Sequence, residues 1–98
     1  MLYAMIAKDK PNGVEHRLAT RPEHLAHLAS LGDAVVFAGA LLDTDDKPNG
    51  SMVVLEAQSL AEAEALAAAD PFVKKGVFES YTVQRWNWAV NNPTGRGQ

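Results

Sequence analysis

The hydrophobic positions of this chain fall into six segments, which are separated by polar residues or by glycine and proline. Four segments are short and apolar, as is typical of strands, and two have the wider spacing of an amphipathic helix. The predicted order is therefore strand, helix, strand, strand, helix, strand. We expect strands over residues 2–8, 34–42, 51–57 and 77–88, and helices over 20–32 and 59–70.

Two similar patterns mark the predicted helix starts. Residues 20–23 (Thr-Arg-Pro-Glu) and 59–62 (Ser-Leu-Ala-Glu) each place a hydroxyl side chain three residues before a glutamate. This is the spacing of a capping box, in which the two side chains accept hydrogen bonds from free backbone N–H groups at a helix start. The second helix should end at Asp70, because Pro71 disfavours helical geometry in the residue before it.

The order of elements predicts a ferredoxin-like α+β fold with the arrangement βαββαβ. In this fold both helices lie on one face of a four-stranded antiparallel sheet. The other face is free of helices, and a face in contact with water should carry polar side chains in alternation with apolar ones. The strands over residues 2–8 and 51–57 instead have apolar residues on both faces. We therefore expect the uncovered face to pack against a second copy, forming a homodimer.

Composition narrows the class of protein. The 98 residues suffice for one domain, expected over 1–88, and a polar tail follows over 89–98. The net charge of -3, without a run of Lys or Arg, argues against a nucleic-acid partner. The apolar start lacks both a basic leader and the length of a membrane span, so we expect a cytoplasmic protein without membrane contact. The absence of cysteine excludes disulfides and thiol nucleophiles.

Asp70 is an unusual residue for its predicted place, because it falls on the apolar stripe of the second helix, at the last turn. A carboxylate there meets partly negative carbonyl groups, which costs about 0.3–1 kcal/mol at the surface. We expect a proton donor opposite it, and His24, at the edge of the first helix's stripe, is the candidate. Such a pair is a recurring acid/base unit. Alternatively, Asp70 caps the turn over 72–75 and His24 is a core histidine.

Two arginines precede His24 and are candidates for substrate binding. Arg17 and Arg21 offer forked donors that suit a carboxylate or a phenolate. The alternative is a solvated basic loop, or an ion pair with Asp9 or Glu15.

No metal or other cofactor is expected. His24 and His27 are three residues apart, but no acidic third ligand has a fixed spacing to them, and His27 is expected in solvent. The sequence also lacks a glycine-rich phosphate loop. Trp86 and Trp88 alternate along the last strand and should share a face, where they contact the core or the second copy; a ligand wall is the alternative.

Five short patterns stand at residues 21–25 (Arg-Pro-Glu-His-Leu), 38–39 (Ala-Gly), 50–51 (Gly-Ser), 69–72 (Ala-Asp-Pro-Phe) and 76–77 (Gly-Val). Together they resemble the YCII-related family, over nearly the whole chain to about Trp88. The resemblance implies a dimeric ferredoxin-like α+β barrel whose active site is built on His24 and Asp70. Most such relatives have no established reaction, but one similar enzyme group removes chloride from a chlorinated hydroxyhydroquinone. This chain differs in having Gly39-Ala40 where relatives often have Gly-Pro, and in its Trp-Asn-Trp segment.

The leading hypothesis is a small-molecule enzyme of the lyase or isomerase type that needs no cofactor. His24 would exchange a proton with a phenolic or otherwise acidic substrate held by Arg17 or Arg21, and Asp70 would orient His24. One alternative is a noncatalytic dimeric module that binds a metabolite or a partner. A second is cofactor-free oxygenation on a similar dimeric barrel.

Overall fold

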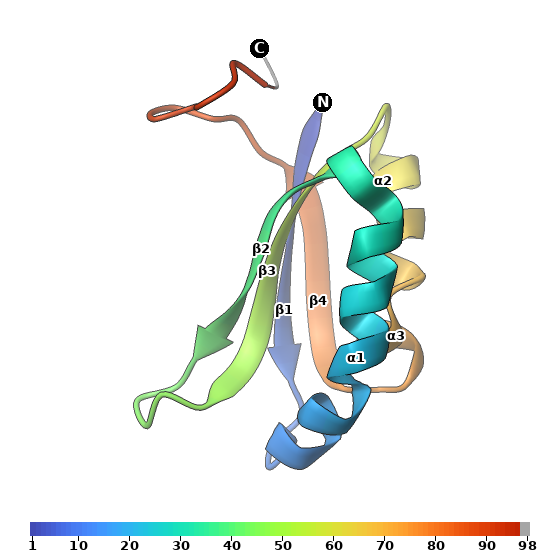
Figure 1. The fold of residues 1–98 in the computed structure, drawn as a ribbon, viewed down its shortest axis with the longest axis vertical. Coiled ribbons are helices and arrows are strands. Elements are labelled where there is room, and N and C mark those ends of the chain that lie inside the picture. The colour runs from blue at the N-terminus through green and yellow to red at the C-terminus, as the bar shows by residue number, and fades with distance from the viewer. Residues whose placement is uncertain (97–98) are drawn as a thin grey trace.

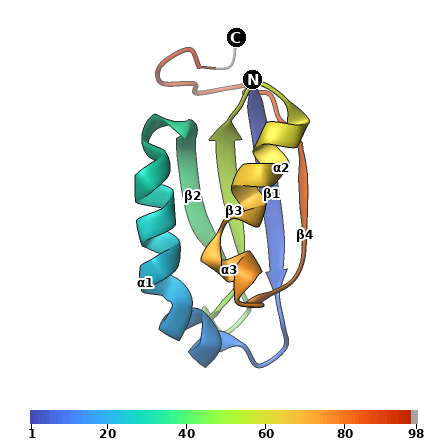
Figure 2. The same ribbon diagram turned by 90° about the vertical axis from the view of Figure 1, so that its right-hand side faces the viewer.

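A computed structural model describes residues 1–96 of the chain. The strands form one antiparallel sheet in the order β2-β3-β1-β4, and the helices cover one face of it (Figures 1 and 2). The predicted ferredoxin-like α+β fold is confirmed. The elements are β1 (Leu2–Asp9), α1 (Val14–Leu31), the short 3₁₀ helix η1 (Gly32–Ala34), β2 (Val35–Leu42), β3 (Pro48–Glu56), α2 (Leu60–Ala68), α3 (Pro71–Lys74) and β4 (Phe78–Arg85).

Helix α1 begins at Val14 instead of after Thr20, so the capping box predicted over residues 20–23 is wrong. Its N-cap is Gly13, and Pro22 lies inside the helix. Residues 14–19 contain no glycine or proline, so nothing in the local sequence stops the helix from extending backward. Proline at an interior position removes one backbone N–H donor, a loss that the surrounding structure tolerates here.

The second predicted helix divides into two at Asp70. Helix α2 ends at Ala68, and Asp70 is the N-cap of the short helix α3, with φ -64° and ψ 130°. Proline is favoured in the first turn of a helix but disfavours helical backbone before it, so Pro71 both ends one helix and opens the next. The capping contact predicted for Ser59 is confirmed, because its Oγ accepts a hydrogen bond from the Glu62 N–H at 3.1 Å.

The sheet has a different environment on each face. The face under the helices carries the larger core, in which Phe72 is the largest fully buried side chain. The opposite face has no helix over it within residues 1–96 (Figure 1). Part of that open face is covered by Trp86 and Trp88, which lie beyond the end of β4 and contact Phe37 edge to face. The two tryptophans therefore share a face, as predicted, although the strand is shorter than predicted.

Residues 86–96, which follow β4, fold back on the chain. The Arg96 guanidinium donates a hydrogen bond to the Asp33 carbonyl and lies 3.6 Å from the Glu56 carboxylate. Within residues 1–96, no helix has the length and apolarity needed to cross a membrane.

Candidate active site

A cavity of about 310 Å³ lies between helix α1 and the edge strand β2. This volume is at the lower end of the range for ligand sites, which suits a small metabolite. Arg17, Arg21 and His24 all line it from α1, because spacings of four and three residues place them on one helix face. The remaining lining is largely apolar and includes Leu18, Leu25 and Leu28 from α1 and Ala38, Gly39 and Ala40 from β2.

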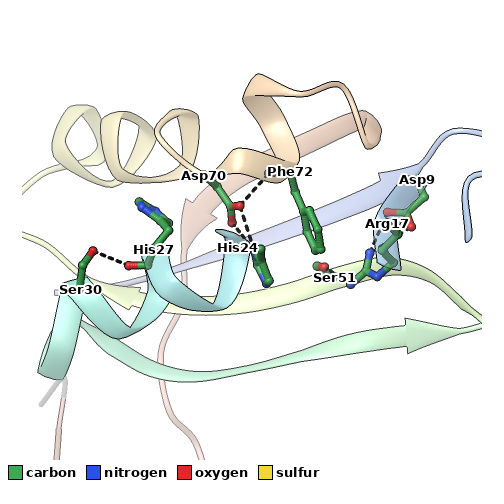
Figure 3. Close-up of polar contacts among 8 residues, drawn as sticks. All are labelled: Asp9, Arg17, His24, His27, Ser30, Ser51, Asp70 and Phe72. Atoms are coloured by element: carbon green, nitrogen blue, oxygen red, sulfur yellow. Dashed lines mark hydrogen bonds and ion pairs between the residues drawn. The ribbon is translucent and has the colours of Figure 1, made fainter. Parts of the chain in front are cut away.

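His24 and Asp70 form a buried pair across α1 and the start of α3. The His24 Nδ1 lies 2.9 Å from each carboxylate oxygen of Asp70 (Figure 3). His24 is 7% exposed and Asp70 is 2% exposed. The predicted contact between the two side chains is confirmed.

Asp70 holds this position for a different reason from the one the sequence suggested. Its Oδ1 also accepts a hydrogen bond from the Phe72 N–H at 2.9 Å, which caps α3. The carboxylate therefore lies at a helix N-terminus, where the partial positive charge of the free N–H groups stabilises it. Asp70 therefore makes both predicted contacts: it caps a helix, and it pairs with His24.

The hydrogen bond to Asp70 determines which nitrogen of the imidazole carries the proton. A carboxylate accepts hydrogen bonds, so the His24 Nδ1 carries the proton that the pair shares. The other nitrogen, Nε2, lies on the opposite edge of the ring and points away from Asp70 (Figure 3). In the neutral ring this nitrogen has a free lone pair, so the arrangement suits it to accept a proton from a molecule bound in the cavity.

Phe72 stacks on His24. The ring centroids are 3.9 Å apart and the ring planes differ by 8°. Periodicity gave no indication of this contact, because residues 24 and 72 are far apart in sequence. The only signal was the position of Phe72 within the family-like pattern over 69–72.

Arg17 is buried and engaged by two polar partners. Its Nη1 donates to both carboxylate oxygens of Asp9, at 2.9 and 3.0 Å, and its Nη2 donates to the Ser51 Oγ at 2.7 Å. The guanidinium carbon is 4.7 Å from the centre of the Phe72 ring. The ion pair with Asp9, considered above as the alternative for Arg17, is therefore present beside the cavity.

The remaining basic candidates differ in exposure. Arg21 is exposed at the cavity, and no ion pair involves it within residues 1–96. His27 is partly buried, and its backbone carbonyl accepts a hydrogen bond from the Ser30 hydroxyl (Figure 3). No cluster of three potential metal ligands occurs in the described part of the chain.

Comparison with known sequences gives a consistent set of relatives. The profile of the YCII-related domain matches residues 1–87. Protein YciI of Escherichia coli O6:H1 is 41% identical over an alignment of 92 residues, and the match covers 86% of this chain and 94% of that protein. An uncharacterized protein of Haemophilus influenzae is 36% identical with the same coverage.

Comparison with solved structures adds one similar enzyme. The 5-chloro-2-hydroxyhydroquinone dehydrochlorinase TftG of Burkholderia phenoliruptrix, solved in complex with 2,5-dihydroxybenzoquinone, is 31% identical with a TM-score of 0.84. The match covers 91% of this chain and 96% of that one. Protein Atu4242 of Agrobacterium tumefaciens has a TM-score of 0.58 at 18% identity, covering 95% and 98% of the two chains, and shares the fold.

Proposed function

Because the chain belongs to the YCII-related family, we propose that it is a small-molecule enzyme in which His24 and Asp70 carry out acid/base chemistry of the lyase or isomerase type. The observation that carries this proposal is the buried His24–Asp70 pair beside a cavity of about 310 Å³. A base held by a third group, with its free nitrogen next to a ligand-sized space, is the geometry that proton transfer requires.

The proposed step begins when His24 Nε2 takes a proton from an acidic hydroxyl, or from carbon next to a carbonyl. Asp70 stabilises the imidazolium that forms and keeps the ring in one orientation. In an isomerisation, Nε2 returns the proton to another atom of the same substrate. In an elimination, the electron pair left by the proton moves through the substrate and departs with an anionic leaving group.

A flat, acidic ring compound is the substrate class that we propose. The dehydrochlorinase named above acts on a chlorinated hydroxyhydroquinone, and its structure holds a dihydroxybenzoquinone. In this chain, leucines of α1 and small residues of β2 offer apolar walls for a ring. Arg21 lies one helical turn before His24, so its guanidinium is suited to a second acidic group of the same molecule.

The second candidate is a noncatalytic dimeric module that binds a metabolite or a partner. One observation favours it: His24 and Asp70 each make a second contact that serves the fold and needs no substrate. Asp70 caps α3, and His24 stacks on Phe72. The pair would therefore persist in a protein that catalyses nothing.

We also propose that the open sheet face joins two copies of this chain. Ile6 is 42% exposed and Leu41 is 39% exposed, although both belong to sheet strands. Exposed apolar surface of this kind is typical of an interaction site, and antiparallel sheets with two apolar faces need both covered.

Chloride release from 5-chloro-2-hydroxyhydroquinone, measured by ion chromatography, tests the enzymatic role. Binding of 2,5-dihydroxybenzoquinone is measured in parallel by calorimetry. We expect His24→Gln to lower kcat by about 10²–10⁴-fold, the usual contribution of a general acid or base. We expect His27→Gln, on the same helix but outside the cavity lining, to match the unmodified protein.

Two results would argue against catalysis by this pair. One is turnover by His24→Gln at the rate of the unmodified protein. The other is binding of the quinone by the unmodified protein with no turnover of chlorinated or unchlorinated hydroxyhydroquinones, which would favour the binding module. Circular dichroism of each variant establishes that any loss of kcat is not a loss of folding.

A further inference from the structure

We propose that Arg17, fixed by Asp9 and Ser51, is a positioning residue that acts through Phe72 to hold the plane of the His24 ring. This inference rests on the proposed function, because it treats His24 as the group that transfers the proton. It gives Arg17 a role distinct from substrate binding, which is then assigned to Arg21.

The bond to Asp70 does not by itself fix the direction of His24 Nε2. A hydrogen bond at Nδ1 holds one edge of the imidazole but permits the ring to tilt about that contact. The parallel Phe72 ring, 3.9 Å away, removes this freedom, because any tilt would bring the two rings into collision or open a gap between them. Phe72 therefore decides which part of the cavity Nε2 faces.

Phe72 is itself held from several sides. Its side chain is fully buried, its backbone N–H bonds to Asp70, and the edge of Phe78 meets it at a centroid distance of 5.5 Å. Figure 3 shows Phe72 between His24 and Arg17, whose guanidinium carbon lies 4.7 Å from the ring centre. A cation at this distance is attracted to the aromatic ring. Arg17 thus supports the side of Phe72 that His24 does not contact.

The guanidinium is well suited to this support because hydrogen bonds to two other side chains, Asp9 and Ser51, fix its own position. Asp9 comes from the end of β1 and Ser51 comes from β3, so Arg17 ties α1 to two adjacent strands. A buried ion pair contributes little net stability compared with apolar residues of the same volume. Stability alone therefore does not account for this one, whereas a fixed, planar surface against Phe72 does.

The test compares three altered proteins. Asp9→Asn with Arg17→Met removes the ion pair and leaves no unpaired buried charge, while Phe72→Leu removes the aromatic surface. The control is Glu23→Gln with Lys75→Met, which removes an exposed ion pair of 2.6 Å between α1 and the end of α3. The control and the Asp9/Arg17 variant therefore both lose an ion pair of α1, but only the Asp9/Arg17 variant and Phe72→Leu lose the support of the His24 ring.

The first measurement needs no substrate. In protein with isotope-labelled histidine, the ring signals of His24 and their contacts with Phe72 are recorded by NMR, with His16 and His27 as internal references. We expect the Asp9/Arg17 variant and Phe72→Leu to broaden or split the His24 signals and to leave the other two histidines unchanged. The control should leave all three unchanged. Unaltered His24 signals in the Asp9/Arg17 variant would overturn the proposal.

The second measurement is kinetic, on the chlorinated hydroxyhydroquinone. We expect the Asp9/Arg17 variant to lower kcat by about 10- to 100-fold, as expected for a misplaced catalytic group, with KM changed less than about threefold. A raised KM with unchanged kcat would overturn the proposal by showing that Arg17 contacts substrate. If the double variant does not fold, Arg17→Lys takes its place, because it keeps a charge for Asp9 but lacks the planar surface.

The two measurements separate this proposal from the proposed function. If His24→Gln retains full turnover, the enzymatic role of His24 fails. The NMR comparison still decides whether Arg17 controls the orientation of that ring.

Discussion

Asp70 has partners on two sides. One oxygen, Oδ1, accepts hydrogen bonds both from the Phe72 backbone and from the His24 ring, while Oδ2 contacts the ring alone. The residue that binds the imidazole is therefore also the residue that starts the helix carrying Phe72. Asp70 therefore acts on His24 in two ways: it bonds the ring directly, and it caps the helix that carries the stacked ring of Phe72.

Substitutions at Asp70 should separate its two roles. Asparagine caps helices about as well as aspartate, whereas alanine does not, so Asp70→Asn should be more stable than Asp70→Ala by about 1 kcal/mol in urea unfolding. Both should lower kcat by about 10²–10⁴-fold, because an amide cannot stabilise the imidazolium and favours the wrong tautomer. Full activity of Asp70→Asn would show that the carboxylate serves only as a cap.

Arg21 should affect binding rather than chemistry. Hydrogen bonds to charged groups contribute about 1.5–3 kcal/mol, so Arg21→Gln should raise KM by about tenfold or more for a substrate with a second acidic group. We expect kcat to change little, because within residues 1–96 no ion pair joins Arg21 to His24 or Asp70, whose own bond is to each other. Arg85→Gln, an exposed arginine on β4, is the matched control. A fall in kcat at constant KM would contradict this assignment.

At the scale of elements, two patterns with the same spacing behave differently. Ser59 caps α2 as predicted, whereas Thr20 is an interior residue of α1. The difference lies outside the four-residue pattern: the residues before Thr20 can continue a helix, and tertiary packing buries Thr20 itself. Periodicity therefore predicted which elements exist and in what order, but local signals did not determine every boundary, because packing competes with them.

The Ser59 cap should have a measurable effect on stability. Ser59→Ala should lower the free energy of unfolding by about 1 kcal/mol, because the Glu62 N–H loses its acceptor. Ser59→Asp keeps an acceptor and adds a charge that the helix N-terminus favours, so it should match or exceed the serine protein. Urea unfolding of the three proteins provides the comparison. Equal stability of the alanine and serine proteins would show that water replaces the cap without loss.

The candidate site was only partly predictable from sequence, because several of its contacts depend on tertiary packing. The inward position of Asp70 led to His24, although the carboxylate proved to lie at the start of a helix and not at the end of one. The stack on Phe72 and the contact of Arg17 with Ser51 join segments that only the folded sheet brings together. Such contacts follow from register and helix placement, which hydrophobic patterns do not specify.

At the scale of the whole molecule, the two faces of the sheet have separate roles in our proposals. The cavity lies beside α1 on the helix-covered face, while the proposed dimer contact uses the open face. Along β1, Met5 and Ala7 belong to the core under the helices, whereas Leu2 and Ala4 belong to the cluster on the open face. A change on the open face should therefore leave the His24–Asp70 pair in place.

Ile6 provides the test of assembly. It pairs with Met52 of β3 and Thr82 of β4, so it lies on a central strand. It alternates with Ala4 of the open-face cluster, so it points to that face, and it is 42% exposed. A charge buried without a partner is strongly unfavourable, so Ile6→Glu should convert a dimer into a monomer in size-exclusion chromatography with light scattering. Leu60→Glu, at a leucine of α2 that is 44% exposed, should remain dimeric. A monomeric unmodified protein at micromolar concentration, or a dimer that persists with Ile6→Glu, would contradict assembly through this face. Retention of quinone binding by the monomeric variant would show further that the cavity is complete within one chain.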